Sequence, residues 1–596
     1  MAETATLGWV DYLVIGVMLC ISASIGIYYR FTGGRQKTVE EYFNADRSMS
    51  VLPVGIALVV SFMSAITILG VSAENYAFGT QFVVINIAYL VGIPIICYGF
   101  LPVFFKLQAT SAYEYLEKRF GVGARLVASF AYWIQLFLYS GIVLYAPALA
   151  LEATTGLSKN ASILIVGLVC AFYSGIGGIK AVLMTDVFQG ILMFLSVLVI
   201  IGTAAKTVGG LDQIWYIAEK GGRIEFDSYS IDPTVRHTWW SLLIGGLFTF
   251  LSLFGVNQVQ IQRMMTVKSL KAARLTLWIN WPILSLLSIL TCFSGLAIYS
   301  KYYNCDPLTQ GRISSIDQLM PLYVVDTMSH LPGLPGLFIA GIFSAGLSTL
   351  SAGLNSLAAV TIEDYFKPVY EKFAGKEFPP LKLTLLGKVF AFVFGLSCIA
   401  LAFLAQYLGD ILQVSLTIFG VVGGPLLGIF TLGMGFESAG QSGAITGLMT
   451  SLAFLLWIAF GTPRPTNELL PLSVAGCEIN DANSTLSTPT LSPTDNESYF
   501  YLYRISYMWY APLGFLITII VGLVVSNLVY LCSGRERVEC DPDLFFPFVS
   551  TRLRRKLRLN TESNGHQIPS IVLQRKYTFD DDHDVSQRDQ VASTVV

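Results

Sequence analysis

The sequence predicts an all-α polytopic membrane protein with about 13 transmembrane helices. Hydrophobic residues make up 54% of its 596 residues, and charged residues make up only 13%. Soluble globular proteins carry roughly twice that charged share. Apolar runs long enough to cross the hydrocarbon core of a lipid bilayer recur along the whole chain. The net charge of −2 and the lack of a basic surface motif give no indication of a nucleic-acid partner.

The apolar runs divide the chain into one long membrane part and a tail. We expect spans near residues 9–30, 51–73, 81–105, 126–150, 161–178, 184–205, 238–258, 275–299, 334–360, 385–406, 411–433, 440–460 and 509–532. A single transmembrane domain is therefore expected over residues 1–534, with a largely disordered cytoplasmic tail over residues 535–596. The first run is too long, and lacks the basic flank, for a cleavable signal peptide.

The distribution of Lys and Arg predicts the orientation. Alternate loops near residues 30–47, 106–125, 263–274 and 367–382 are rich in basic residues. Because basic loops stay on the cytoplasmic side, the amino terminus is expected outside and the tail inside the plasma membrane. A basic cluster shortly after the last span agrees; it contains Arg552, Arg554, Arg555, Lys556 and Arg558. The final Thr594-Val595-Val596 fits a ligand of a PDZ-domain protein, although such endings also arise by chance.

One predicted outer loop carries signs of an extracellular environment. The segment near residues 461–508 is rich in Ser, Thr, Pro and Asn, and its sequons predict glycosylation of Asn483 and Asn496. Of the nine cysteines, Cys305 and Cys477 fall in predicted outer loops. An oxidising exterior permits a disulfide between them, and two free thiols remain the alternative.

A long uncharged span contains an unusual number of hydroxyl groups. No ionisable residue occurs between Leu331 and Ile362. The polar residues near the middle of this stretch are Ser344, Ser348, Thr349, Ser351, Asn355 and Ser356. Sodium is a hard cation that takes oxygen ligands, including hydroxyls and carbonyls freed from helical bonding. Small polar residues also let neighbouring membrane helices approach closely, which is the competing interpretation.

Asp186 is one of very few charged residues predicted at membrane depth. A carboxylate there is a functional candidate by default, because burying charge in a bilayer is costly. It could help to release a cation toward the cytoplasm. Alternatively, it is an acid at a helix N-terminus that the helix dipole stabilises.

Two spans are interrupted by polar residues and glycine. Residues 61–70 mix hydroxyls into an apolar run that closes with Gly70, and residues 245–263 join Gly245-Gly246 to Gly255-Val-Asn-Gln. These interruptions lie about five spans apart. Broken helices at matching positions of two repeats indicate a transporter binding site, because unwound backbone supplies ligands for ions and substrate.

Sequence motifs of enzymes are absent. The chain has four histidines, none of them in a cluster with zinc-ligand spacing, and no phosphate-binding loop or nucleophile elbow occurs. We expect a protein that is not an enzyme, and one that uses no cofactor beyond a coupling ion.

Several segments resemble the sodium:solute symporter family. These segments are Thr110–Phe120, Leu144–Leu151, Gly255–Arg263, Leu331–Phe338, Leu347–Thr349, Ala359–Asp364 and Phe419–Gly428. The family is similar to the LeuT-type inverted-repeat transporters, and within it the chain most resembles the sodium-coupled monocarboxylate, multivitamin and iodide transporter branch. The resemblance implies a LeuT-like 5+5 core of two inverted repeats, at about residues 51–205 and 238–433.

The resemblance also implies a sodium site between the first broken helix and the hydroxyl-rich span. Its ligands would be the carbonyls of Ser64, Thr67 and Ala345 and the hydroxyls of Ser348 and Thr349. Asp186 matches the acidic position of the family's Thr-Asp-x-x-Gln segment, as a second cation site or a release path.

The same resemblance places a mainly apolar substrate cavity between the repeats. Its lining would include Phe62, Thr67, Asn257, Gln413 and Leu416. The span at residues 275–299 contains no Lys before its end, which makes a sugar substrate less suitable. We also expect no Arg or Lys in the core for a bidentate carboxylate clamp.

These features predict a sodium-coupled secondary active symporter that works by alternating access. The expected substrate is a small organic anion, either a monocarboxylate such as lactate or nicotinate or a carboxylate vitamin such as biotin or pantothenate. A sodium/iodide-type symporter is the alternative within the branch. A substrate-gated membrane sensor or leak channel without coupled transport is the alternative from another class.

Overall fold

The computed structural model describes residues 7–32, 45–108, 110–176, 179–376, 378–407, 409–463, 469–477, 499–533 and 541–563. Within these ranges the secondary structure is helical apart from one isolated bridge between Met49 and Val267. The longer helices of the first half are α1 (Trp9–Phe31), α3 (Val51–Phe62), α4 (Ala65–Phe78), α5 (Ile85–Ile95), α6 (Leu101–Leu107), α7 (Glu114–Phe120), α8 (Val122–Thr155), α9 (Lys159–Ile176), α10 (Ile179–Val208) and α11 (Leu211–Lys220). Those of the second half are α12 (Gly246–Gly255), α13 (Gln258–Met264), α14 (Leu270–Tyr302), α15 (Leu319–Met328), α16 (Leu334–Val360), α17 (Lys367–Ala374), α18 (Pro380–Ala405), α19 (Ile411–Ile418), α20 (Gly424–Gly435), α21 (Gln441–Phe460), α22 (Tyr510–Ser533) and α23 (Pro547–Ser563).

Short 3-10 and π segments connect or extend these helices. They are η1 (Ala45–Arg47), η2 (Thr80–Val84), η3 (Ile96–Phe100), η4 (Ser241–Gly245), η5 (Ile316–Gln318), η6 (Thr361–Phe366), η7 (Phe419–Gly423), η8 (Tyr501–Arg504), η9 (Tyr507–Trp509) and η10 (Pro542–Leu544). Several of them are single-turn π segments inside longer spans, as in η3, η4, η6 and η7.

The prediction of an all-α polytopic membrane protein is confirmed, with a small difference in the number of spans. Ten helices of the described chain are long and apolar enough to cross a membrane, and 12 spans result when each of two bent helix pairs counts as one. Every predicted span coincides with a helix. The thirteenth falls on α9, whose apolar stretch among the residues searched, Lys159–Ala171, is short for a span.

Both polar interruptions break their helices. The axis bends by 60° between α3 and α4, and by 57° between α12 and α13. At the first break, Ser64 has extended backbone angles of φ −83° and ψ 173°. At the second, Asn257 is also extended, and its side chain accepts a hydrogen bond from the Val259 amide. The freed backbone groups of a broken membrane helix need new partners, and the Asn257 side chain supplies one at the second break.

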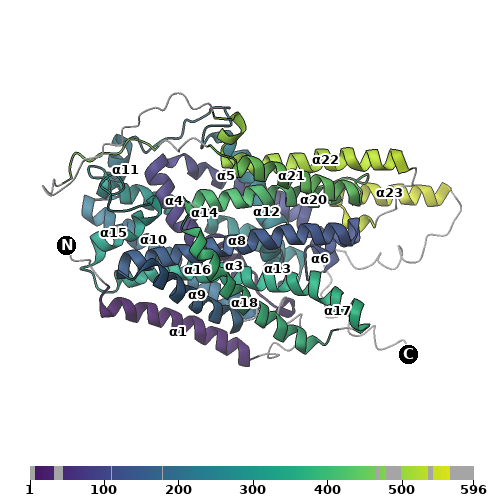
Figure 1. Cartoon of the computed structure of the whole chain (residues 1–596), viewed down its shortest axis with the longest axis horizontal. Coiled ribbons are helices and arrows are strands. Elements are labelled where there is room, and N and C mark those ends of the chain that lie inside the picture. The colour runs from purple at the N-terminus through teal and green to yellow at the C-terminus, as the bar shows by residue number, and fades with distance from the viewer. Residues whose placement is uncertain are drawn as a thin grey trace.

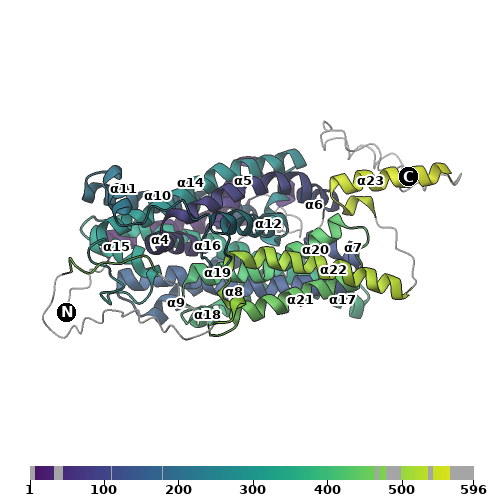
Figure 2. The same cartoon turned by 90° about the horizontal axis from the view of Figure 1, so that it is seen from above.

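The helices run mainly along the long axis of the molecule (Figure 1). At one end lie α11 and α15, and we call this the disulfide end because the disulfide of Cys305 and Cys477 lies there. At the other end lie α6, α17 and α23, and we call this the tail end (Figure 1, Figure 2). In Figure 2, α14 and α5 lie along one side of the body, and α18 and α21 lie along the opposite side.

The hydroxyl-rich helix α16 is almost entirely buried at the centre of the bundle. Its glycines permit this position, because they let neighbouring helices approach closely. A Cβ atom at Gly346 would stand only 2.5 Å from Pro147 of α8, and one at Gly341 would collide with Ser196 of α10. Helix α16 therefore packs between α8 and α10, and its small residues serve packing as well as any chemistry.

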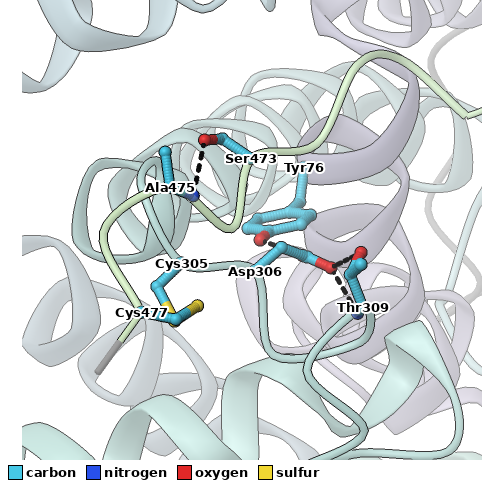
Figure 3. Close-up of a disulfide and its surroundings, with 7 residues drawn as sticks. All are labelled: Tyr76, Cys305, Asp306, Thr309, Ser473, Ala475 and Cys477. Atoms are coloured by element: carbon cyan, nitrogen blue, oxygen red, sulfur yellow. Dashed lines mark hydrogen bonds between the residues drawn. A yellow bond between two sulfur atoms is a disulfide. The ribbon is translucent and has the colours of Figure 1, made fainter. Parts of the chain in front are cut away.

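A disulfide joins Cys305 and Cys477, 172 residues apart in the sequence. Around it, the segment of residues 469–477 is bonded to the helical body (Figure 3). The Asp306 amide donates to the Ser473 carbonyl at 2.9 Å, and Tyr76 of α4 donates its hydroxyl to the Asp306 carboxylate at 2.6 Å. The disulfide thus fixes a surface segment beside the C-terminal end of the first broken helix pair.

The described part of the tail, residues 541–563, is ordered against the body. Asp543 pairs with Lys106 of α6 at 3.0 Å, and the Phe546 amide donates to the Met434 carbonyl of α20 at 2.9 Å. Tyr115 of α7 donates its hydroxyl to the Leu544 carbonyl at 3.0 Å. Aromatic side chains anchor this stretch, which includes the helix α23, at the tail end.

Candidate functional site

A cavity lies at the two helix breaks. The empty space within it, counted together with its opening to solvent, is about 870 Å³. Its lining comes from α3, α4, α5, α8, α12, α13, α14, α16, α19 and the segments between them. The residues are Ser61, Phe62, Met63, Ser64, Ile66, Thr67, Val71, Phe82, Tyr89, Leu136, Tyr139, Leu253, Asn257, Val259, Gln260, Ser288, Thr349, Gly353, Leu412, Ser415, Leu416 and Phe419.

Aromatic rings form much of the cavity wall. Phe62 contacts Tyr89 with ring centroids 6.0 Å apart and Phe254 at 5.4 Å. On another side, Tyr139 and Phe419 meet edge to face at 4.6 Å. Rings of this kind give a wall with large apolar area and few rotatable bonds. The cavity can therefore hold a compact organic molecule by shape and apolar contact.

A few polar side chains interrupt this apolar wall. Ser61 and Gln260 bond to each other across the two broken helix pairs, with Gln260 Nε2 donating to Ser61 Oγ at 3.1 Å. Asn257 lies at the second break, and Ser288 projects from α14. Such groups orient a ligand while the wall supplies the contact area.

Three of the predicted sodium ligands meet at this cavity. Ser64 and Thr67 lie at the start of α4, with their hydroxyl oxygens 3.5 Å apart, and Thr349 reaches the cavity from α16. Tyr139 donates its hydroxyl to Ser64 Oγ at 3.2 Å. The Thr349 hydroxyl is buried and has no hydrogen-bond partner. A buried oxygen without a partner is costly unless a ligand satisfies it, so this arrangement suits a cation with oxygen ligands.

The hydroxyl of Ser348 lies in a different direction from that of Thr349. It donates to Asp186 Oδ1 at 2.5 Å, and Asp186 Oδ2 accepts from Arg263 Nη2 at 2.8 Å. Ser348 and Asp186 are fully buried, and Arg263 is 1% exposed. Ala345 lies one turn before Ser348 on the same buried helix. The predicted five-residue set is thus divided between the cavity and a neighbouring charged cluster.

Asp186 is not at a helix N-terminus. It is the eighth residue of α10, which begins at Ile179, so stabilisation by the first turn of the helix does not account for it. Its pairing with Arg263 gives a buried ion pair instead. The expectation of no Arg or Lys in the core is wrong for Arg263, which ends the interrupted span that the sequence singled out. A charged residue at the end of this interrupted span was the available signal.

Four of the five predicted substrate residues line the cavity, and the fifth does not. Phe62, Thr67, Asn257 and Leu416 line the cavity. Gln413 does not: its Oε1 accepts from Arg236 Nη1 at 2.7 Å, at the disulfide-end side of the cavity. On a helix, the cavity-lining Leu412 and Leu416 lie on one face, and residue 413 is turned by about 100° from Leu412. Side-chain direction, which depends on the docking of α19, decided this outcome.

A charged cluster covers the disulfide-end side of the cavity. Arg236 Nε donates to Glu74 Oε1 at 2.6 Å and its Nη2 donates to Glu74 Oε2 at 2.9 Å. Burial by itself lowers the pKa of Arg236, but the Glu74 carboxylate raises this pKa above its ordinary value. Burial, together with the positive charge of Arg236, lowers the pKa of His237, so that histidine is neutral at pH 7.

Two further carboxyl groups lie close to Glu74. Burial raises the pKa of Asp317 to about 7, and the charges of Asp410 and Glu74 add to this effect. Burial also raises the pKa of Asp410. The Asp317 carboxylate accepts from the Ile411 amide at the start of α19 at 3.2 Å. This side of the site therefore carries one guanidinium and three carboxyl groups, of which Asp317 titrates near neutral pH.

Other predicted sites fall outside the described residues. These are the glycosylation candidates Asn483 and Asn496 and the terminal Thr594, Val595 and Val596. No group of three or more His, Cys, Asp or Glu side chains in the described ranges could hold a metal ion.

Comparison with known proteins identifies the chain's relatives. The model of the sodium:solute symporter family matches residues 42–451. A putative sodium-dependent multivitamin transporter of Drosophila melanogaster is 52% identical over 563 residues, covering 93% of each chain. Sodium-coupled monocarboxylate transporter 1 of Homo sapiens is 42% identical over 551 residues, covering 89% of this chain and 88% of the relative.

A solved structure has the same arrangement of helices. It is a Na+-coupled sialic acid symporter in a substrate-bound outward-open state, described as having a novel Na+ site. The superposition has a TM-score of 0.72 at 25% identity and covers 87% of this chain and 98% of the symporter. Two broken helix pairs around a central cavity, in this fold, define a secondary transporter rather than an enzyme. The chain belongs to the sodium:solute symporter family. It is a sodium-coupled solute symporter and a multi-pass membrane protein.

Proposed function

We propose that this symporter imports a small organic anion, either a monocarboxylate or a carboxylate-bearing vitamin, across the plasma membrane. The observation that carries the proposal is the cavity at the two helix breaks, with aromatic walls, a few polar groups and an unpartnered threonine hydroxyl at its edge. Relatives that share 40% or more of the sequence are named for monocarboxylates and for multivitamins, which supports this substrate class.

We propose that sodium binds between α4 and α16. Its ligands are the carbonyls of Ser64, Thr67 and Ala345 and the hydroxyls of Ser348 and Thr349. The buried, unpartnered Thr349 hydroxyl beside Ser64 and Thr67 supports this site. The Ser348 hydroxyl donates its proton to Asp186, and its oxygen still has two lone pairs with which to bind a cation.

We propose that Asp186 forms a second cation site or a release path next to the first. Its carboxylate is fully buried and contacts both Ser348 and Arg263. A cation at this carboxylate has to compete with the Arg263 guanidinium, which is already in place. Movement of α13 relative to α10 during the transport cycle would change that competition.

The orientation follows from the distribution of charge and the disulfide. We propose that the disulfide end is extracellular, because disulfides form in oxidising compartments, and that the basic helix α23 is cytoplasmic. Glycosylation of Asn483 and Asn496 and capture of residues 594–596 by a PDZ domain stay predictions. Each sodium ion that moves inward down a potential contributes about 2.3 kcal/mol per 100 mV, which allows an anion to be concentrated.

The test is uptake into cells that express the full chain. Labelled lactate, nicotinate, biotin, pantothenate and iodide are supplied with and without sodium, and surface expression is measured in parallel. Accumulation of one organic anion that needs sodium, and that falls in the Ser348→Ala/Thr349→Ala double variant, supports the proposal. Accumulation of iodide alone identifies an inorganic-anion symporter. Substrate-evoked current without accumulation identifies a sensor or leak channel.

A further inference from the structure

One accessible cation adjoins the cavity at its disulfide-end side. We call Arg236, Glu74 and Gln413 the roof cluster. Arg236 uses three nitrogens on the other two side chains, with two hydrogen bonds to the Glu74 carboxylate and one to Gln413 Oε1. Its guanidinium also lies over the ring of Phe78, at 4.2 Å, and near that of Tyr507, at 5.3 Å.

The roof cluster is continuous with the cavity. Glu74 follows the cavity-lining Val71 by one helical turn of α4, and Gln413 is flanked on α19 by the lining residues Leu412 and Leu416. His237, next to Arg236, contacts the ring of the lining residue Phe82 at 5.3 Å. The roof cluster therefore lies directly beside the cavity lining.

Arg236 is more exposed than Arg263, the arginine that pairs with Asp186. Its side chain is 16% exposed, whereas that of Glu74 is 3% exposed and that of Arg263 is 1% exposed. Among the described residues that line the cavity, none is a Lys or an Arg. Arg236 is thus the cation that an entering anion can reach, and Glu74 covers it from the protein side.

The geometry of the pair matches recognition of a free carboxylate. Two parallel N–H donors of a guanidinium hold a carboxylate with charge-assisted bonds, and Glu74 occupies that position. Because Glu74 is itself buried, it keeps Arg236 as its counter-ion, whereas the neutral Gln413 can leave the guanidinium without stranding a charge. The nearby acids Asp410 and Asp317 disfavour an anion at any point that Arg236 does not reach.

We infer that Arg236 is the entry site for the substrate carboxylate, where the substrate takes the place of Gln413 at Nη1 before it reaches the cavity, while Glu74 stays bonded to Nε and Nη2. This inference rests on the proposed function, because it requires a carboxylate-bearing substrate. Glu74 shares the guanidinium with the substrate, so its negative charge weakens the binding of a second carboxylate there. The exchange also releases the connection that Arg236 makes between α4 and α19, so carboxylate binding loosens the roof of the cavity.

The test measures sodium-dependent uptake of the labelled carboxylate that the wild-type chain accumulates, at several substrate and sodium concentrations. In Arg236→Lys, which keeps the charge but loses the two-pronged contact, the KM for the carboxylate rises by about tenfold, while the sodium concentration for half-maximal uptake stays within about twofold. In Glu74→Gln, which removes the competing carboxylate, the KM falls by several-fold. Arg312→Lys serves as the matched control, because Arg312 lies at the same end and pairs with Asp326 on the surface.

Opposite shifts of KM in the two roof variants are required. If Arg236→Lys fails to reach the cell surface, the fall of KM in Glu74→Gln still decides the matter. An unchanged or raised KM in Glu74→Gln, or equal shifts for Arg236→Lys and Arg312→Lys, overturns the entry site while the symport of carboxylates stands. Failure of the wild-type chain to accumulate any carboxylate overturns both.

Discussion

The hydroxyl of Ser348 donates to the Asp186 carboxylate at 2.5 Å, whereas the hydroxyl of the next residue, Thr349, borders the cavity with no partner. Adjacent residues on a helix differ by about 100° in direction, so one hydroxyl pair serves two neighbouring sites. The charged cluster of Asp186 and Arg263 therefore lies beside the proposed sodium site without being part of the cavity wall. This division gives the two residues different expected roles.

Substitution of Thr349 and Ser348 separates these roles. Thr349→Ala removes a proposed sodium ligand that makes no hydrogen bond, so the sodium concentration for half-maximal uptake should rise by about tenfold without loss of thermal stability. Ser348→Ala removes a buried donor to Asp186 and should cost about 1–3 kcal/mol of stability as well. Thr349→Ser is the matched control and should behave like the wild type. Equal loss of stability in both alanine variants would contradict the division.

The buried pair of Asp186 and Arg263 should stabilise the fold through mutual compensation. Asp186→Asn leaves Arg263 as a buried cation without its counter-charge, which costs about 3–5 kcal/mol and should lower surface expression. The double variant Asp186→Asn/Arg263→Gln removes both charges and should recover a large part of this loss. Thermal unfolding of the purified protein in detergent measures both. No recovery in the double variant would show that the pair is not energetically coupled.

Asp317 should make stability depend on pH near neutrality. Its folded-state pKa of about 7 lies above the ordinary value, so the protonated acid favours the folded state. The stabilisation is complete below pH of about 4 and is lost as the pH rises to about 7, with a slope of up to about 1.4 kcal/mol per pH unit. Asp317→Asn stays neutral and can still accept from the Ile411 amide, so it should lack this slope. The measurement is the unfolding temperature of the wild type and of Asp317→Asn between pH 5 and 8. The prediction is wrong if the unfolding temperatures of the two proteins change with pH in the same way.

The disulfide should contribute to stability through the length of the loop that it closes. Cys305 and Cys477 are 172 residues apart, for which chain-entropy estimates give an upper bound of roughly 5 kcal/mol. The Cys305→Ser/Cys477→Ser double variant should therefore unfold at a lower temperature and be insensitive to reducing agent. The wild type should move toward the variant when it is reduced. Thiol labelling shows whether the reductant has opened the disulfide of the wild type. If the disulfide is open and the unfolding temperature has not changed, this prediction is wrong.

The ordered part of the tail should detach when its aromatic anchor is removed. Phe546 contacts Phe100 edge to face at 5.1 Å, and its amide bonds to Met434. Phe546→Ala should therefore speed tryptic cleavage within the basic helix α23. Phe548 is 72% exposed, so Phe548→Ala is the control and should alter cleavage much less. Equal cleavage rates in the two variants would show that Phe546 does not anchor the tail.

Local signals in the sequence were sufficient for the helical part of the fold. The spans were readable because a bilayer requires long apolar runs, and the breaks at Ser64 and Asn257 were readable because hydroxyl, amide and glycine residues interrupt such runs. The approximate neighbourhood of the site followed, since Phe62, Thr67, Asn257 and Thr349 all line one cavity. The excess in the number of predicted spans arose at α9, where the apolar stretch is short.

Only the tertiary structure decided which side chains face one another. Gln413 points to Arg236 rather than into the cavity, and Ser348 points to Asp186 rather than along with Thr349. These outcomes depend on the rotation of each helix about its own axis, which packing against neighbouring helices sets. The sequence by itself determined where the chain crosses the membrane and where its helices break, because those depend on local hydrophobicity and backbone bonding. Arg263 lies 77 residues from its partner Asp186 in the sequence, and Arg236 lies 162 residues from Glu74. Only the packing of the helices brings these partners together.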